Sequence, residues 1–142
     1  RTEIMELTRN LVRIIKYIKH AANRYVIYSF PTSDKEMREL APVINSACIE
    51  IAAAIKHLPR NRDLDSYLNA INRYEVHADN IYHNGLKRRF AEIRQNRIDS
   101  EKLIEEFRTR DDAKSSHAEL EKASDACTDV ASSLKRMVAV NV

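Results

Sequence analysis

The sequence contains very few of the residues that make tight turns, with a single glycine, Gly85, and three prolines among 142 residues. A β-sandwich or β-barrel needs turn residues at regular short intervals, so this scarcity argues against an all-β fold. The two common nucleotide-binding loops each need glycines at fixed spacing, and neither is present. Tryptophan is absent, and the aromatic residues are six tyrosines and three phenylalanines. A core built mainly from Leu, Ile, Val and Ala favours helices.

Other absences narrow the class of protein further. The two cysteines, Cys48 and Cys127, are too few for a disulfide framework, and their apolar neighbours predict buried free thiols in a reducing compartment. The sequence has no apolar run long enough to cross a membrane. A balance of 24 basic against 21 acidic residues does not indicate nucleic-acid binding. The motifs HExxH, GxSxG and CxxC are also missing, so we expect a single soluble domain over residues 1–142 that is not an enzyme.

Apolar residues that recur every three or four positions predict an all-α bundle of long helices. Pro31 and Pro59 are expected to end the first two helices, and Pro42 to bend the second or split off its first turn. Gly85 lies inside the third stretch, where it costs about 1 kcal/mol relative to alanine, which indicates close packing. The predicted helices cover about Thr2–Tyr28, Ser33 or Asp34 to Leu58, and Asp63–Ile93, followed by a last stretch from Asp99 to Val140 that we expect to break within the polar run Arg108–Ser116.

Two acidic rows have the four-residue spacing that places side chains on one face of a helix. The first row is Glu75, Asp79 and His83, which borders the apolar stripe of its helix. Carboxylates and an imidazole in a row could supply part of a metal site or form an ordinary solvated helix flank.

The second row is His117, Glu121, Asp125 and Asp129, whose last three members point away from the apolar stripe. Like charges four residues apart repel one another. We therefore expect the row to attract a cation, a basic side chain or another protein.

Basic residues form a third row, opposite the apolar stripe of the first helix. Its members are Arg9, Arg13, Lys16 and His20, with Arg24 beyond them. The row could be a solvated face or a strip for an anionic partner, such as a lipid surface or an acidic helix. If the first and last helices are neighbours, the basic strip faces the acidic row across their shared outer groove.

Two segments resemble one known family. Residues 71–82, INRYEVHADNIY, resemble the INRLExEADxIY segment of PhoU-like phosphate-transport regulators, in the branch associated with Pit-type inorganic phosphate transporters. Residues 123–131, ASDACTDVA, resemble that branch's ATDxCxDVA segment. The opening residues Arg1 to Ile4 resemble the stretch after the family's PFxR turn, in the middle of the family chain. Because the chain starts at Arg1, we expect an N-terminal segment with the first family helix to be missing from it.

The resemblance implies antiparallel helices in three-helix units and a non-enzymatic cytoplasmic regulator at the inner face of the cell membrane. Its implied partner is an inorganic phosphate transporter or a phosphate-signalling protein, and a homodimer is compatible with the exposed charged rows. Family E/DxxxD motifs can bind iron or zinc clusters on the outer surface of the bundle. The positions that match them are Glu75, Asp79, Glu121, Asp125 and Asp129.

The sequence departs from the family where the family has an acidic DDVxDYIE-like stretch. Arg13, Lys16 and Lys19 replace carboxylates there. We therefore predict that Arg13 or Lys16 pairs with Asp125 or Asp129 in place of a metal, and that Arg9, Arg13 and Lys16 form a partner-binding strip. The alternatives are a carboxylate-rich iron or zinc protein, for example of the di-iron type, and a generic helical interaction module.

Overall fold

The computed structural model describes residues 2–27, 35–58, 64–95 and 100–140 of the chain. Within these ranges it describes all side chains except those of residues 25, 27, 89, 92, 93, 100–116 and 140. The described residues form four helices and no strand, so the predicted all-α class is confirmed. The helices are α1 (Thr2–Ile27), α2 (Lys35–His57), α3 (Asp65–Gln95) and α4 (Ser100–Val140).

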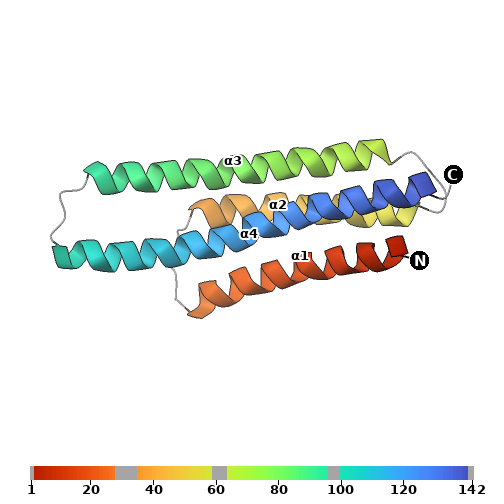
Figure 1. Cartoon of the computed structure of the whole chain (residues 1–142). Coiled ribbons are helices and arrows are strands. Elements are labelled where there is room, and N and C mark those ends of the chain that lie inside the picture. Colours follow the sequence, from red (N-terminus) through yellow and green to blue (C-terminus); the bar gives the residue numbers. More distant parts are fainter. Residues whose placement is uncertain (1, 28–34, 59–63, 96–99, 141–142) are drawn as a thin grey trace.

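Helix α4 contacts more helices than any other helix of the bundle. It packs against each of the other three helices, and α2 also packs against α3. Helix α1 packs closely against α4 and has no comparable backbone contact with α2 or α3. Figure 1 shows α4 between α1 and α3, with the two chain termini at the same end, so that α1 and α4 run antiparallel. The molecule is therefore a three-helix unit, α2–α4, with α1 added along one side of α4.

One predicted boundary is wrong. We expected a break within Arg108–Ser116, but α4 is a continuous helix from Ser100 to Val140. The polar run contains no glycine or proline, and residues such as Arg, Lys and Ala sustain a helix without an apolar face. The polar composition of this run therefore does not end the helix.

The other boundaries agree with the prediction to within about two residues, an ordinary uncertainty for helix ends. Helix α2 continues through Pro42, so no first turn is split off, although the proline cannot donate a backbone hydrogen bond there. The proposed helix starts at Ser33 or Asp34, the stop residues Pro31 and Pro59, and the turn at residues 96–99 lie outside the described residues.

The core of the described residues consists of two clusters, and both include side chains of α1 as well as of α2, α3 and α4. Its largest fully buried apolar side chains are Leu40, Ile71, Val130 and Leu134. Small buried residues lie between them on the facing helices and allow the helix axes to approach closely; they include Ala47, Ala54, Ala78, Ala123 and Ala126. Both cysteines are free thiols, as predicted, and Cys127 is buried, whereas Cys48 is only half-buried beside the core.

Gly85 has the packing role that its position in a helix suggested. A Cβ atom at this position would lie 2.5 Å from Cγ of Glu36 and 3.0 Å from its Cδ. The side chain of Glu36 is only 6% exposed, and its Oε1 atom lies 2.5 Å from Nη2 of Arg88. The glycine therefore leaves room for a buried carboxylate from α2 to cross α3 and reach an arginine one turn further on.

Candidate functional site

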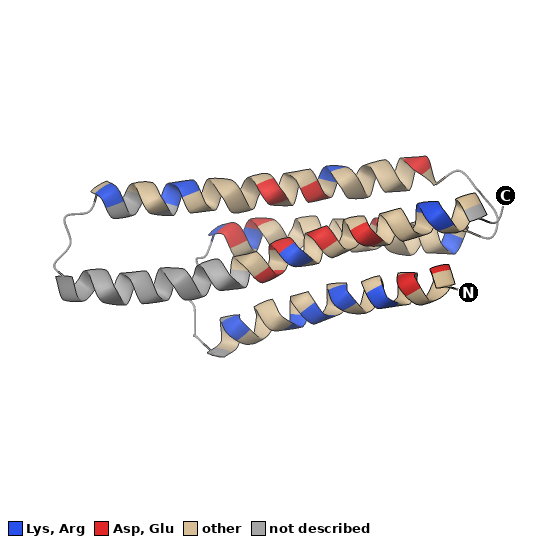
Figure 2. Cartoon of the chain, viewed as in Figure 1, with Lys and Arg blue, Asp and Glu red and all other residues tan. Residues whose placement is uncertain are grey.

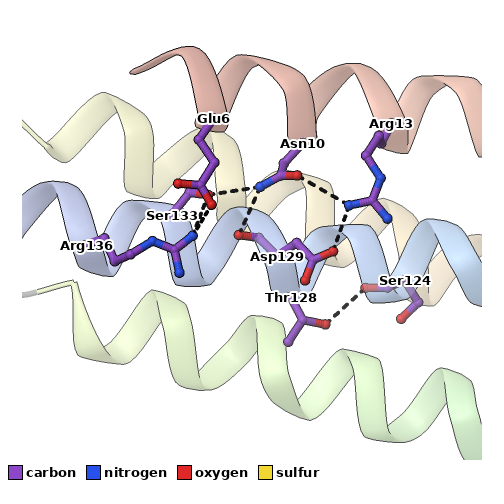
Figure 3. A network of polar contacts seen from close by, with 8 residues as sticks. All are labelled: Glu6, Asn10, Arg13, Ser124, Thr128, Asp129, Ser133 and Arg136. Carbon is purple, nitrogen blue, oxygen red and sulfur yellow. Dashed lines mark hydrogen bonds and ion pairs between the residues drawn. The ribbon is translucent and has the colours of Figure 1, made fainter. Parts of the chain in front are cut away.

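The contact between α1 and α4 includes a ladder of polar and charged pairs beside its buried apolar residues, and Figure 3 shows the pairs made by the first half of α1. The α1 members follow one another at spacings of three, four or seven residues, so they lie on one face of the helix. The pairs across the interface are Glu6 with Arg136, Asn10 with Ser133, Arg13 with Asp129, and His20 and Arg24 with Glu119.

The pairing predicted for Arg13 is confirmed. Its Nη1 atom donates a hydrogen bond to Oδ2 of Asp129 at 2.9 Å. The same nitrogen donates to Oδ1 of Asn10 at 3.4 Å, and Asn10 in turn donates from Nδ2 to the Ser133 hydroxyl at 3.0 Å. Arg13 thus neutralises one end of the acidic row, as expected if a guanidinium replaces a cation there. It is used within the molecule, whereas Arg9 and Lys16 make no ion pair with any described side chain.

The ladder also contains a buried charge that the sequence analysis did not single out. The side chain of Glu119 is 11% exposed, and its Oε2 atom has no hydrogen-bond partner among the described residues. Three basic side chains surround it, with nitrogen–oxygen distances of 3.7 Å to His20 and 3.9 Å to Arg24 and Lys122. Glu119 lies two residues before Glu121, so the four-residue spacing of the acidic row does not include it.

Four of the five predicted metal ligands do come together. Glu75 and Asp79 on α3 interact with Glu121 and Asp125 on α4, and we name these four residues the carboxylate quartet. Burial, followed by the charge of Asp125, raises the pKa of Glu121 from its ordinary 4.5 to about 7. Burial and the neighbouring carboxylates likewise raise the pKa of Glu75, and burial is the main cause that raises the pKa of Asp125. Glu75, Glu121 and Asp125 therefore retain protons at pH values where isolated carboxyl groups have lost them.

The remaining members of the two acidic rows have other roles. Asp129 forms an ion pair with Arg13, and the Nδ1 atom of His83 lies 3.2 Å from Oδ1 of Asp79. His117 is 1% exposed and belongs to the buried part of α4 rather than to the outward acidic row. Figure 2 shows the resulting distribution, with basic residues along α1 and acidic residues in the middle of α3 and α4.

The quartet does not have the geometry of a bound metal ion. Among the side chains that the structure describes, no three of His, Cys, Asp and Glu converge closely enough to hold one. Its donors are also all oxygen atoms, which suit hard cations, whereas zinc sites are usually built with Cys or His. The described side chains therefore form no assembled metal centre as they are placed, and iron or zinc binding here remains a prediction.

A cleft of about 420 Å³ lies where the first turn of α2 meets α3. Its charged side chains are paired with one another, Arg88 with Glu36 at 2.5 Å and Lys35 with Glu39 at 3.7 Å. Opposite charges in such pairs offset each other, so the cleft presents no net charge to attract an anion such as phosphate.

The outer side of α1 was not predicted as a separate surface. We expected one apolar stripe along this helix, but its residues divide between two environments. Leu7, Ile14 and Ala21 are buried against the rest of the bundle, whereas Ile4 is 57% exposed and Ile18 37% exposed. The sequence does indicate an exposed apolar surface on α1, because its apolar residues cover more of the helix circumference than one neighbouring helix can bury.

Comparisons with models of known protein families, with curated proteins and with solved structures found no match. No helix within the described residues has the length and apolar character that a membrane crossing requires. The resemblance to PhoU-like regulators thus rests on the two sequence segments named above, of which the first includes Glu75 and Asp79 and the second Asp125 and Asp129.

Proposed function

We propose that this chain is a non-enzymatic cytoplasmic accessory protein of inorganic phosphate transport, which docks to a phosphate transporter or to its signalling partner. The observation that carries the proposal is the exposed apolar side of α1, because a contiguous apolar surface of this kind marks an interaction site. The two segments that resemble PhoU-like regulators supply the identity of the process. Packing of α2, α3 and α4 into one three-helix unit agrees with the architecture that the resemblance implies.

The proposal is tested by measuring uptake of radiolabelled phosphate in cells that normally make the protein. We expect deletion of its gene to change the initial rate of phosphate uptake and a plasmid copy to restore it. Uptake of a second anion, sulfate, serves as the control for a general effect on the membrane. Unchanged phosphate uptake in the deletion strain, over both low and high external phosphate, contradicts the proposal.

A second candidate function is metal binding by the carboxylate quartet, and the convergence of its four like charges is the observation that favours it. Total metal analysis of the purified protein tests this candidate. Stoichiometric iron, zinc or another divalent ion that is lost in a Glu121→Gln/Asp125→Asn variant supports a metal-binding role. The absence of metal from both proteins, purified without chelator, leaves the quartet as a proton-sharing cluster.

A further inference from the structure

The two cysteines of the chain meet across the core. Cys48 lies in the middle of α2 and Cys127 in the second half of α4, and these helices pack directly, with Cα atoms within 8 Å of each other. The two thiol groups are close enough to share a hydrogen bond. The cysteines are far apart in the sequence, so it is the fold that brings them together. Since the chain has no other cysteine, they are the one thiol pair that it can form within itself.

Small residues beside the pair let the two backbones approach closely. Ala47 precedes Cys48 in α2, Ala126 precedes Cys127 in α4, and both alanines are buried. Helices that pack through small side chains have axes about 8 Å apart, and each Cα atom lies about 2.3 Å from its own axis. Facing Cα atoms then come within the range of about 4.4–6.8 Å that a disulfide bond spans. The packing of α2 on α4 is therefore compatible with a bond between the two cysteines.

The two thiols differ in their access to solvent. Cys127 is fully buried, whereas Cys48 is half-buried, so a molecule as small as a peroxide can reach its sulfur. The hydrogen bond from Cys127 lowers the pKa of Cys48 to about 7, which leaves about half of Cys48 as thiolate at neutral pH. The thiolate is the form that attacks peroxides. An accessible thiolate beside a second thiol is the arrangement found in redox-sensitive proteins.

Two other uses of the pair fit less well. Structural zinc sites need four ligands, and among the described side chains no third His, Cys, Asp or Glu completes a metal site with the two thiols. A pair of cysteines that only fills space in the core needs no contact with solvent. Cys48 nevertheless keeps part of its surface exposed.

We propose that Cys48 and Cys127 are a peroxide-sensitive thiol pair, which hydrogen peroxide converts into a reversible disulfide bond between α2 and α4. In the first step the Cys48 sulfur attacks one peroxide oxygen, so that an S–O bond forms and the O–O bond breaks. The hydroxide that leaves takes up a proton and departs as water. Cys48 is then a sulfenic acid, oxidised by two electrons, and the peroxide has been reduced.

Cys127 completes the reaction. Its sulfur attacks the Cys48 sulfur, an S–S bond forms, the S–O bond breaks, and the hydroxyl group leaves with the Cys127 proton as a second water. Two thiols and one hydrogen peroxide thus give one disulfide and two water molecules. A dithiol reductant restores both thiols by exchange. Disulfides in reducing compartments are usually transient in this way, and the thiol pair does not depend on the proposed role in phosphate transport.

The first test treats the purified protein with a small excess of hydrogen peroxide and blocks the remaining thiols with iodoacetamide. We expect peptide mapping without reductant to find the Cys48 peptide joined to the Cys127 peptide, and a non-reducing gel to show no covalent dimer. Dithiothreitol should restore both thiols. Two free thiols after treatment, oxidation of Cys48 to a sulfinic acid without the joined peptide, or a disulfide between two copies of the chain overturn the inference.

Dimedone, which traps sulfenic acids, tests the order of the two steps. In the Cys127→Ala variant the sulfenic acid has no neighbouring thiol to react with, so the dimedone adduct at Cys48 should exceed that of the wild type by about tenfold. In the matched Cys48→Ser variant, Cys127 should take up no dimedone. Equal adduct in the wild type and Cys127→Ala, or labelling of Cys127 in Cys48→Ser, contradicts the assignment. Circular dichroism checks that each variant is folded, and the mapping of the wild type needs no variant.

The same pair can be followed in cells that make the protein. The cells receive a short pulse of hydrogen peroxide and are quenched with acid, which stops thiol exchange. We expect the joined peptide to appear during the pulse and to disappear after the peroxide is removed. A pair that stays reduced throughout the pulse, or a joined peptide that is already present in untreated cells and does not change, overturns the inference.

Discussion

Gly85 gives the sharpest test of how the bundle is packed, because replacement by alanine has two opposing effects. Alanine in the interior of a helix is more favourable than glycine by about 1 kcal/mol. The new Cβ atom, however, would lie 2.5 Å from Cγ of Glu36, which no packed structure tolerates. Glu36 must therefore move, and its buried carboxylate then loses the contact with Arg88.

The steric effect is the larger of the two. Separating the partners of a buried ion pair costs about 3–5 kcal/mol when one charge stays buried, and less when it can turn to solvent. Arg88 is 45% exposed and the adjoining cleft gives Glu36 a route outward, so we take about 2–3 kcal/mol. After the gain in helix propensity, Gly85→Ala should lower the free energy of unfolding by about 1–2 kcal/mol.

A double-mutant cycle measured by urea unfolding, followed by circular dichroism, separates the two effects. In the Glu36→Ala background the steric conflict is absent, so Gly85→Ala should raise the free energy of unfolding by about 1 kcal/mol. The sign of the substitution therefore reverses between the two backgrounds. If Gly85→Ala stabilises the wild-type and the Glu36→Ala protein equally, the reasoning about this contact is refuted.

Three further predictions concern titration and charge. The pKa of Glu121 is raised to about 7, so the folded protein should lose stability as pH rises from 4.5 to about 7. Urea unfolding at a series of pH values should show that Glu121→Gln removes about 1 kcal/mol of this loss, and a difference between wild type and variant that does not change with pH contradicts the prediction. Interaction with Cys127 lowers the pKa of Cys48 to about 7, so iodoacetamide at neutral pH should alkylate Cys48 first, and faster labelling of Cys127 on peptide mapping contradicts this. The exposed Arg13–Asp129 pair should couple by about 1 kcal/mol or less in a double-mutant cycle and weaken with salt, whereas a coupling above about 2 kcal/mol shows that the pair is not screened.

Local patterns were enough to predict the helices and one long-range contact. Apolar spacing placed the four helical stretches, since apolar residues recur every three or four positions along most of each helix. The Arg13–Asp129 pair followed from two complementary rows, one basic and one acidic, on helices assumed to be adjacent. The convergence of the quartet was partly predictable in the same way, because Glu75 and Asp79, and Glu121 and Asp125, each lie one turn apart.

The features that were missed depend on which helices become neighbours. The period of α1 shows that it is apolar over more than half its circumference, but not that α4 alone covers it. Gly85 indicated close packing without identifying Glu36, because the two residues lie on different helices. The polar run in α4 was taken for a break because a helix with no apolar stripe resembles a loop in composition.

The most direct test of the central claim, that docking through α1 regulates phosphate transport, compares two isoleucines. Ile15 is 67% exposed on the outer side of α1, and Ile49 is 59% exposed on α2, so asparagine at either position should leave the fold intact. Phosphate uptake is measured in the deletion strain carrying each variant at equal protein level. The account predicts that Ile49→Asn restores uptake as the wild type does and that Ile15→Asn does not. Full restoration by a folded Ile15→Asn protein would contradict it.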